Sequence, residues 1–196
     1  MITDGVNLRR RIAAAVVAVT MTMGLFLVTA PAAVAEERTC KGSLGAITVD
    51  NLRVPDGASC TLTGTTVKGT VKVESRATLV ANGIRVIGNV QAENARKVVV
   101  RAGSRVGGSV QIVQGGSANI VRTKINGDIL FDDQSRPLAA IRNTVGGNIQ
   151  AFQNTGGIEI SSNRVDGNLQ CKANVPAPTG GGNIVEGSKE DQCKKL

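Results

Sequence analysis

One pattern returns along the chain: an aliphatic residue, any residue, glycine, any residue and a second aliphatic residue. It occurs at residues 67–71, 86–90, 106–110, 125–129, 145–149 and 165–169, and its glycines lie 19 or 20 residues apart. A repeat of nearly fixed length predicts that each unit stacks on a copy of itself, which makes a solenoid. The pattern constrains the fold more tightly than it constrains the function.

The repeat is too short for a strand–helix–strand unit, and its apolar residues alternate as they do in strands. The aliphatic residues on both sides of each glycine should therefore face one interior. We expect two or three short strands in each turn, each paired in parallel with the next turn. Because right-handed crossovers are the rule for parallel strands, the predicted fold class is all-β, a single-stranded right-handed parallel β-helix of about seven turns.

The first 35 residues are typical of a secretory signal peptide. Three arginines at positions 9–11 precede an uncharged apolar run over residues 12–30, and Ala33, Val34 and Ala35 follow. We expect cleavage after Ala35, which leaves residues 36–196 as one β-helix domain, secreted to the medium or the cell envelope. An uncleaved membrane anchor is the alternative, since the run approaches the ~20 residues that a span needs. The arginine pair leaves general and twin-arginine export open.

All four cysteines lie in the part expected to be exported, where disulfides form. Cys40 and Cys60 are 20 residues apart, which is one repeat, and Cys171 and Cys193 are 22 apart. Residues one repeat apart should lie on adjacent turns, about 4.8 Å from each other, and a disulfide spans that distance. We predict the pairs Cys40–Cys60 and Cys171–Cys193, one at each end of the solenoid. Free buried thiols are the alternative.

Composition excludes several chemistries. Residues 36–196 hold 20 Lys and Arg against 14 Asp and Glu, and they contain no His, Trp or Tyr. There is thus no imidazole base, no histidine metal ligand and no Trp or Tyr on which a sugar or a base could stack. We expect no cofactor, no metal site and no nucleic-acid partner.

The units VGGNIQA and VDGNLQC, with the ending PTGGGNIVEGSKEDQC, resemble small secreted bacterial β-helix proteins of the pectate-lyase-like class. The resemblance covers roughly residues 40–193 and implies a right-handed coil. Because that fold includes lyases, hydrolases, adhesins and scaffolds, the resemblance implies no single activity.

A basic column is the strongest candidate for binding. Four basic residues stand three places before the repeat glycines: Arg85, Arg105, Lys124 and Arg164. Like charges directly opposite each other in a sheet are unfavourable, so three on consecutive turns indicate an anionic partner, such as a cell-wall polymer or an acidic polysaccharide. Arg122 and Arg142 form a second pair nearby. A solvated face, screened by salt, is the alternative.

Amide side chains form two further columns. One place after the glycine stand Asn89, Asn148 and Asn168, and three places after it stand Gln91, Gln111, Gln150 and Gln170. Stacked amides can hydrogen-bond along the solenoid and stabilise it. They could also offer donors and acceptors to a glycan, and both interpretations stay open.

We expect a non-catalytic structural or adhesive protein, monomeric or associated end to end, that binds through the basic column and the flanking amide columns. The alternative is a polysaccharide lyase or hydrolase centred on Asp128, Asp132 and Asp133. Paired carboxylates could serve as acid and base or as calcium ligands. However, no other repeat carries such a cluster, and residues 132–137 are typical of a turn.

Overall fold

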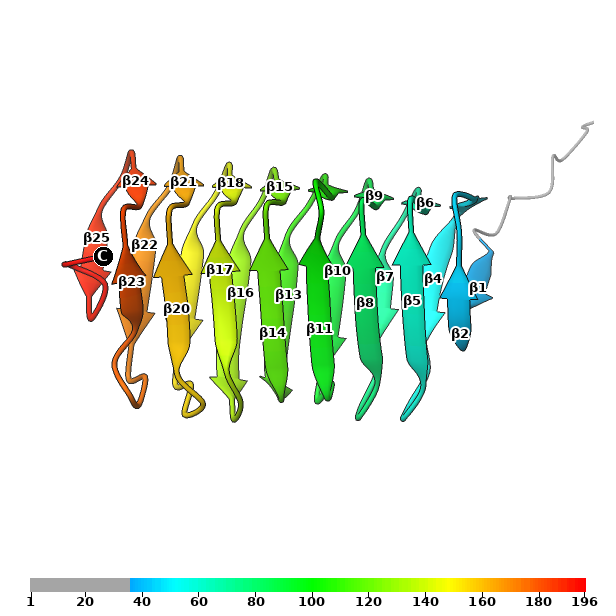
Figure 1. Ribbon diagram of the computed structural model, residues 1–196, viewed down its shortest axis with the longest axis horizontal. Helices are drawn as coiled ribbons and strands as arrows, with labels where there is room; N and C mark the ends of the chain where they lie inside the picture. The colour runs from blue at the N-terminus through cyan, green and yellow to red at the C-terminus, as the bar shows by residue number, and fades with distance from the viewer. Residues whose placement is uncertain (1–35) are drawn as a thin grey trace, which may run out of the picture. The chain divides into compact units, whose positions relative to one another are not determined.

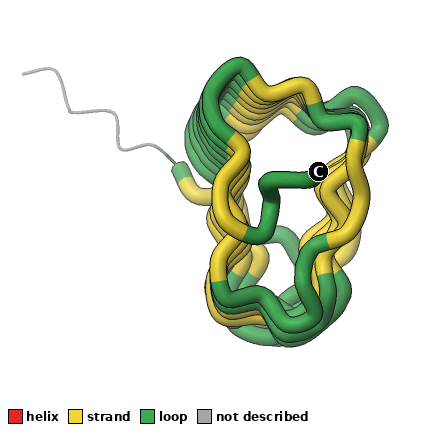
Figure 2. Tube along the Cα trace, turned by 90° about the vertical axis from the view of Figure 1, so that its left-hand side faces the viewer, coloured by secondary structure: helices red, strands yellow, loops and turns green. Residues whose placement is uncertain are grey.

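A computed structural model describes residues 36–196, which form a parallel β-solenoid (Figure 1). Each turn contributes three strands, and equivalent strands of successive turns pair in parallel to make three sheets, named here A, B and C. Viewed along the axis, the turns superpose on one closed outline (Figure 2). The described part contains no helix, and the predicted fold class is confirmed.

The strands are short, and those of sheet C are the shortest. Sheet A contains β1 (Glu37–Thr39), β4 (Asn51–Val54), β7 (Val71–Val73), β10 (Val90–Glu93), β13 (Val110–Gly115), β16 (Ile129–Gln134), β19 (Ile149–Phe152), β22 (Leu169–Lys172) and β25 (Lys189–Asp191). Sheet B contains β2 (Gly42–Leu44), β5 (Ser59–Thr63), β8 (Thr78–Asn82), β11 (Lys97–Arg101), β14 (Ser117–Val121), β17 (Leu138–Ile141), β20 (Ile158–Ser161) and β23 (Thr179–Gly181). Sheet C contains β3 (Thr48–Val49), β6 (Thr66–Val67), β9 (Arg85–Val86), β12 (Arg105–Val106), β15 (Lys124–Ile125), β18 (Thr144–Val145), β21 (Arg164–Val165) and β24 (Ile184–Val185).

The coil is right-handed, as the sequence predicts. In Figure 1 the strands of sheet B run upward on the near side, sheet C crosses the top, and sheet A runs down behind while the turns advance leftward. The solenoid has about eight turns rather than seven. The first turn, residues 36–50, lacks the glycine pattern but contributes β1, β2 and β3.

The predicted signal peptide, residues 1–35, lies outside the described residues, and so does the alternative membrane anchor. Within residues 36–196, no helix is long and apolar enough to cross a membrane.

Each repeat glycine lies at the corner where the chain passes from sheet C to sheet A. The flanking aliphatic residues, such as Val86 and Val90, are buried as predicted, but they belong to different sheets. A Cβ on Gly147 would lie against the Asp128 carboxylate of the preceding turn, and a Cβ on Gly108 would lie against the Asn89 amide. The corner therefore requires glycine for space.

Two files of buried polar side chains run through the interior beside the aliphatic core. One file is Thr123, Asn143, Asn163 and Asn183, and the other is Gln134, Asn154 and Asn174. The Asn163 amide donates to the Ala140 carbonyl (2.7 Å) and to Asn183 Oδ1 (2.9 Å). Its own Oδ1 accepts from the backbone N–H of Asn143 (2.9 Å). The sequence pattern does not predict these two rows of buried polar side chains.

Both predicted disulfides form, with Cα–Cα distances of 5.6 Å for Cys40–Cys60 and 5.2 Å for Cys171–Cys193. In both pairs the two cysteines are displaced by two residues from a shared column, which differs from the exact stacking expected for Cys40 and Cys60. Cys60 is in register with Gly42, and Cys171 is in register with Asp191. Each bond therefore joins an inward strand residue to a cysteine displaced along the neighbouring turn.

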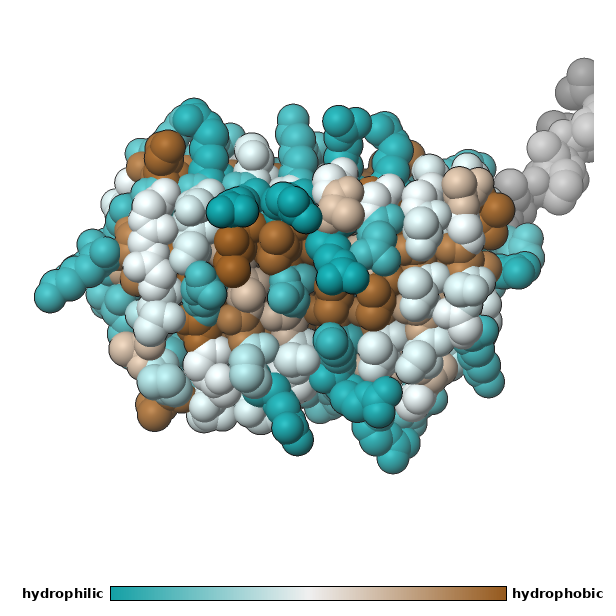
Figure 3. All heavy atoms as spheres, viewed as in Figure 1, coloured by the Kyte–Doolittle hydropathy of each residue, from teal (hydrophilic) through white to brown (hydrophobic). Residues whose placement is uncertain are grey.

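The outer face of sheet B points toward the viewer in Figures 1 and 3. Apolar side chains lie along its middle, and hydrophilic side chains project from its upper margin, next to sheet C (Figure 3). The outward column in the middle of the sheet contains Val80, Val99, Asn119, Ala139 and Glu159. Its two valines are at least partly buried, and Glu159 is exposed.

Candidate functional site: a basic ladder on sheet C

Three basic residues stack on consecutive strands of sheet C. Arg105 is in register with Arg85 on one side and with Lys124 on the other. Each precedes a buried aliphatic residue, so strand alternation turns the basic side chain outward, and all three are exposed. We refer to Arg85, Arg105 and Lys124 as the basic ladder.

The basic ladder has no counter-charge in the described part of the chain. No salt bridge within residues 36–196 involves any of its three members, and none of their side chains makes a hydrogen bond there. Neighbouring strands of a sheet lie about 4.8 Å apart, so the three basic side chains leave the backbone at that spacing. Such a row is unfavourable unless an external anion or solvent offsets the repulsion.

Arg164 occupies the same column, but its surroundings differ. Thr144 separates it from Lys124. Its guanidinium pairs with the Glu186 carboxylate and lies 3.9 Å from Asp166. The charge of Arg164 is therefore neutralised by its neighbours. Of the four basic residues in the column, only the three on consecutive turns have no ion-pair partner within residues 36–196.

An ion pair also marks the other end of the ladder. Thr66 precedes Arg85 in the column, and Lys68 beside it pairs with Asp50 at 3.0 Å. The hydrogen bond and the charge of Lys68 lower the pKa of the Asp50 carboxyl. Both ends of the column are thus charge-balanced, and its middle is not.

The ladder lines a shallow hollow of about 420 Å³. Ile87, Gly107 and Asn126 form part of its lining, and Ile87 is 54% exposed. A Cβ on Gly107 would collide with the Ile87 carbonyl, so this position has no room for a side chain. The hollow thus combines positive charge with one apolar contact.

Arg122 and Arg142 extend the positive surface toward sheet B. Both are exposed and one turn apart at the corner between sheets B and C, with φ of 50° and 56°. Gly83 and Gly182 serve the same corner in other turns. A left-handed conformation costs a non-glycine residue roughly 1 kcal/mol or more, so backbone geometry does not explain arginine at these corners.

The asparagine column supports the backbone of the next turn. The side-chain oxygens of Asn89, Asn148 and Asn168 accept from the N–H groups of Ser109, Asn168 and Ser188, each at 2.8 Å. These contacts agree with the structural interpretation of the column. They leave fewer acceptors free for a glycan.

The glutamine column lies on sheet A, across a corner from the basic ladder. Gln91 donates to Gln111 (3.1 Å) and Gln150 donates to Gln170 (2.9 Å). Leu130 stands between the two pairs. The basic and glutamine columns lie on different sheets, because the chain turns at the repeat glycine between them.

The three aspartates of the enzymatic alternative take different positions. The Asp128 carboxylate accepts from the backbone N–H and the amide of Asn148, at 2.7 and 3.1 Å. Asp132 lies four residues further on, roughly 13 Å along an extended chain. Asp133 has a φ of 55° at the bend of β16, which continues to Gln134, so the predicted turn begins later than expected.

A hollow of about 690 Å³ lies on sheet A and was not predicted. Its lining includes Lys72, Glu74, Gln91, Glu93 and Gln111. Glu74 is held by Arg53 at 3.4 Å. Among residues 36–196 no three Cys, Asp or Glu side chains are grouped so that they could hold a metal ion. Glu74 follows β7 directly and Glu93 is the last residue of β10, so the two occupy equivalent positions one turn apart, a signal that column alignment could have found.

Comparison with protein-family models, with curated proteins and with solved structures found no match to this chain.

Proposed function

We propose that this chain is a secreted bacterial β-helix protein of the pectate-lyase-like class with a non-catalytic, structural or adhesive role at the cell envelope. It binds an anionic cell-wall polymer or acidic polysaccharide through Arg85, Arg105 and Lys124. The two disulfides support an oxidising, extracellular location. The observation that carries the proposal is the in-register row of three uncompensated basic side chains.

The geometry suits a polymer that lies along the solenoid axis. Such a ligand meets one positive charge about every 4.8 Å over three turns. Arg122 and Arg142 add charge on the side toward sheet B, and Ile87 offers an apolar contact in the hollow. The ion-paired Arg164 and the asparagine column, which hydrogen-bonds the backbone, contribute little to this surface.

The test is retention on immobilised polygalacturonate and on immobilised poly(glycerol phosphate), with neutral dextran as the reference matrix. The triple variant Arg85→Gln, Arg105→Gln, Lys124→Gln should lose retention on at least one anionic matrix. The control is Lys172→Gln, Lys194→Gln, Lys195→Gln, which removes the same charge from three exposed lysines near the C-terminal end. It should be retained like the wild type.

Equal retention of the triple variant and the wild type would contradict the proposal. Equal losses in both triple variants would also contradict it, because they would show that net charge alone decides. Release of unsaturated or reducing sugar ends from polygalacturonate, lost in Asp132→Asn, would favour the enzymatic alternative instead.

A further inference from the structure

The N-terminal end of the solenoid is open. The outermost strands β1, β2 and β3 each pair on one side only within residues 36–196. Thr48 is in register with Thr66, so Ile47 stands in the inward column of Thr65. Thr65 is fully buried, whereas Ile47 is 44% exposed. Within residues 36–196, no strand covers this interior position.

A hollow of about 280 Å³ lies at this end. It is lined by Ile47 and Val49 together with Glu36, Arg38 and Asp50. Leu44 and Val49 are in register with the buried residues Leu62 and Val67, yet both remain partly exposed. Three sheet edges and part of the core thus meet solvent at one place, which is the arrangement that promotes edge-to-edge pairing.

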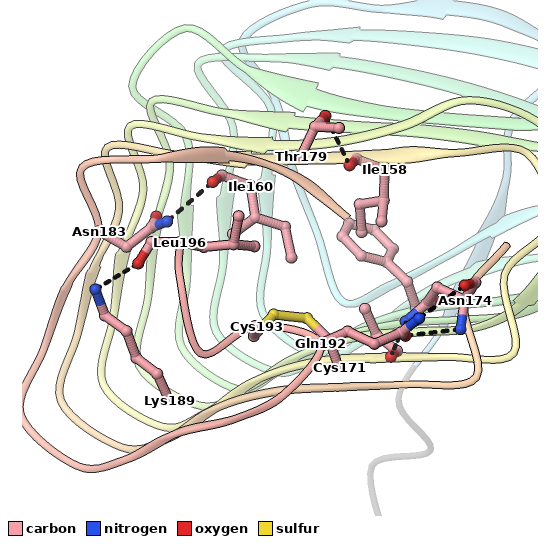
Figure 4. The surroundings of a disulfide bond; sticks show 12 residues. Ile158, Ile160, Cys171, Asn174, Thr179, Asn183, Lys189, Gln192, Cys193 and Leu196 are labelled. Atoms are coloured by element: carbon pink, nitrogen blue, oxygen red, sulfur yellow. Dashed lines mark hydrogen bonds between the residues drawn. A yellow bond between two sulfur atoms is a disulfide. The ribbon is translucent and has the colours of Figure 1, made fainter. Parts of the chain in front are cut away.

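The C-terminal end is closed by its own chain. After β25 the last residues fold across the end of the core, and Cys193 and Leu196 are buried there (Figures 2 and 4). Lys189 donates to the Leu196 carbonyl, and the bond from Cys193 to Cys171 fixes the cap. Gln192 completes the inner file, since its Oε1 accepts from the Asn174 amide at 3.1 Å. The outermost strands β23, β24 and β25 also pair on one side only within residues 36–196, but the core between them is covered.

We propose that the N-terminal end is the interface of a head-to-head homodimer, in which a second copy of this chain covers Ile47 and the edges of β1, β2 and β3. Another solenoid end presents strand edges around a matching outline, which an ordinary peptide does not. The end also carries both signs of charge, since Glu36, Arg38 and Lys41 are exposed and make no salt bridge within residues 36–196. A two-fold contact places a surface against itself, and a mixed surface can do so without net repulsion.

The closed C-terminal end limits this association to two copies. A head-to-tail contact would repeat and produce a filament, but the cap leaves no matching open end. The dimer would also carry two basic ladders on one rod, which raises avidity for a long polyanion. The interface itself does not depend on polymer binding.

The test is the mass in solution, by light scattering over a range of concentrations, of residues 36–196 and of the full chain. Residues 36–196 hold all described strand pairs, the core and both disulfides. The matched variants are Ile47→Lys at the open end and Ile184→Lys, which changes an isoleucine 61% exposed on β24 at the closed end. Wild type and Ile184→Lys should be dimers, and Ile47→Lys should be a monomer with an unchanged thermal midpoint at low concentration.

A wild-type monomer at the highest soluble concentration would overturn the proposal, as would assemblies larger than a dimer. A dimer that survives Ile47→Lys but not Ile184→Lys would also overturn it. If only residues 36–196 dimerise, residues 1–35 take the place of the second copy in the full chain, and the proposal fails for that chain. Oxidation of Ile47→Cys should give a covalent dimer and oxidation of Ile184→Cys should not, a readout that tolerates a weak interface.

Discussion

At the residue scale, the repeat glycines owe their place to crowding between turns. The corner leaves room for a polar side chain of the preceding turn, and that side chain accepts hydrogen bonds from the backbone after the glycine. Asp128, for example, accepts from the N–H of Asn148 next to Gly147. Each glycine thus makes room for the hydrogen-bonding side chain of the preceding turn. Because both are needed at every corner, the pattern repeats regularly.

Replacement of Gly147 by alanine should destabilise the protein by about 1–3 kcal/mol, the usual range for an overpacked interior site. The added Cβ would lie against the Asp128 carboxylate and the Gly127 carbonyl carbon. The measurement is the midpoint of urea unfolding. Gly45→Ala is the control, because a Cβ there meets no atom within 4 Å. Equal midpoints for the two variants would contradict this account of the corner.

At the element scale, stability comes from columns that cross many short strands. The strands of sheet C have two residues each and could not persist alone, but each is paired on both sides except at the ends. The inner asparagine files add hydrogen bonds at the corners, where strand pairing is interrupted. The solenoid therefore contains rows of hydrogen-bonded polar side chains inside an aliphatic core.

Loss of one inner asparagine should cost more than loss of one outer asparagine. Asn163→Ala leaves the Asn143 N–H buried without its partner and removes the side-chain bond to the Ala140 carbonyl, which should lower the free energy of unfolding by about 2 kcal/mol. Asn119→Ala, on the exposed face of β14, should change it by less than about 0.5 kcal/mol. Denaturant titration of both variants checks this, and similar losses would argue against a structural role for the file.

The columns were predictable because a fixed period of 19 or 20 residues aligns equivalent positions of successive turns. That period correctly paired the cysteines and stacked Arg85, Arg105 and Lys124. The corner at each glycine was not predictable from alternation, since Val86 and Val90 both face inward and mimic one continuous strand. Asn154 resembled an ordinary turn residue, because the sequence does not reveal that its amide points inward.

At the scale of the whole molecule, the two ends of the solenoid differ in how far the core is covered, and the sheets differ in charge. One end is capped by the chain's own last residues and the other exposes Ile47. One sheet carries the basic ladder, and a neighbouring sheet carries the glutamine column and an acidic hollow. The neutralised position of Arg164 could not be predicted, because its partner Glu186 lies 22 residues away and one turn further along the solenoid.

The central claim is that polyanions bind to the basic residues of the column that have no ion-pair partner, Arg85, Arg105 and Lys124. Neither the number of basic residues in the column nor the net charge of the protein decides binding. The direct measurement is the affinity of two single variants from that column for soluble polygalacturonate at about 0.15 M salt, where screening acts beyond ~8 Å. Arg105→Gln removes an unpaired charge, and Arg164→Gln removes an ion-paired one. Arg105→Gln should weaken binding about fivefold or more, in line with the ~1 kcal/mol of a charged contact, while Arg164→Gln should leave it within about twofold. Equal effects of the two changes, or a larger effect of Arg164→Gln, would contradict the claim.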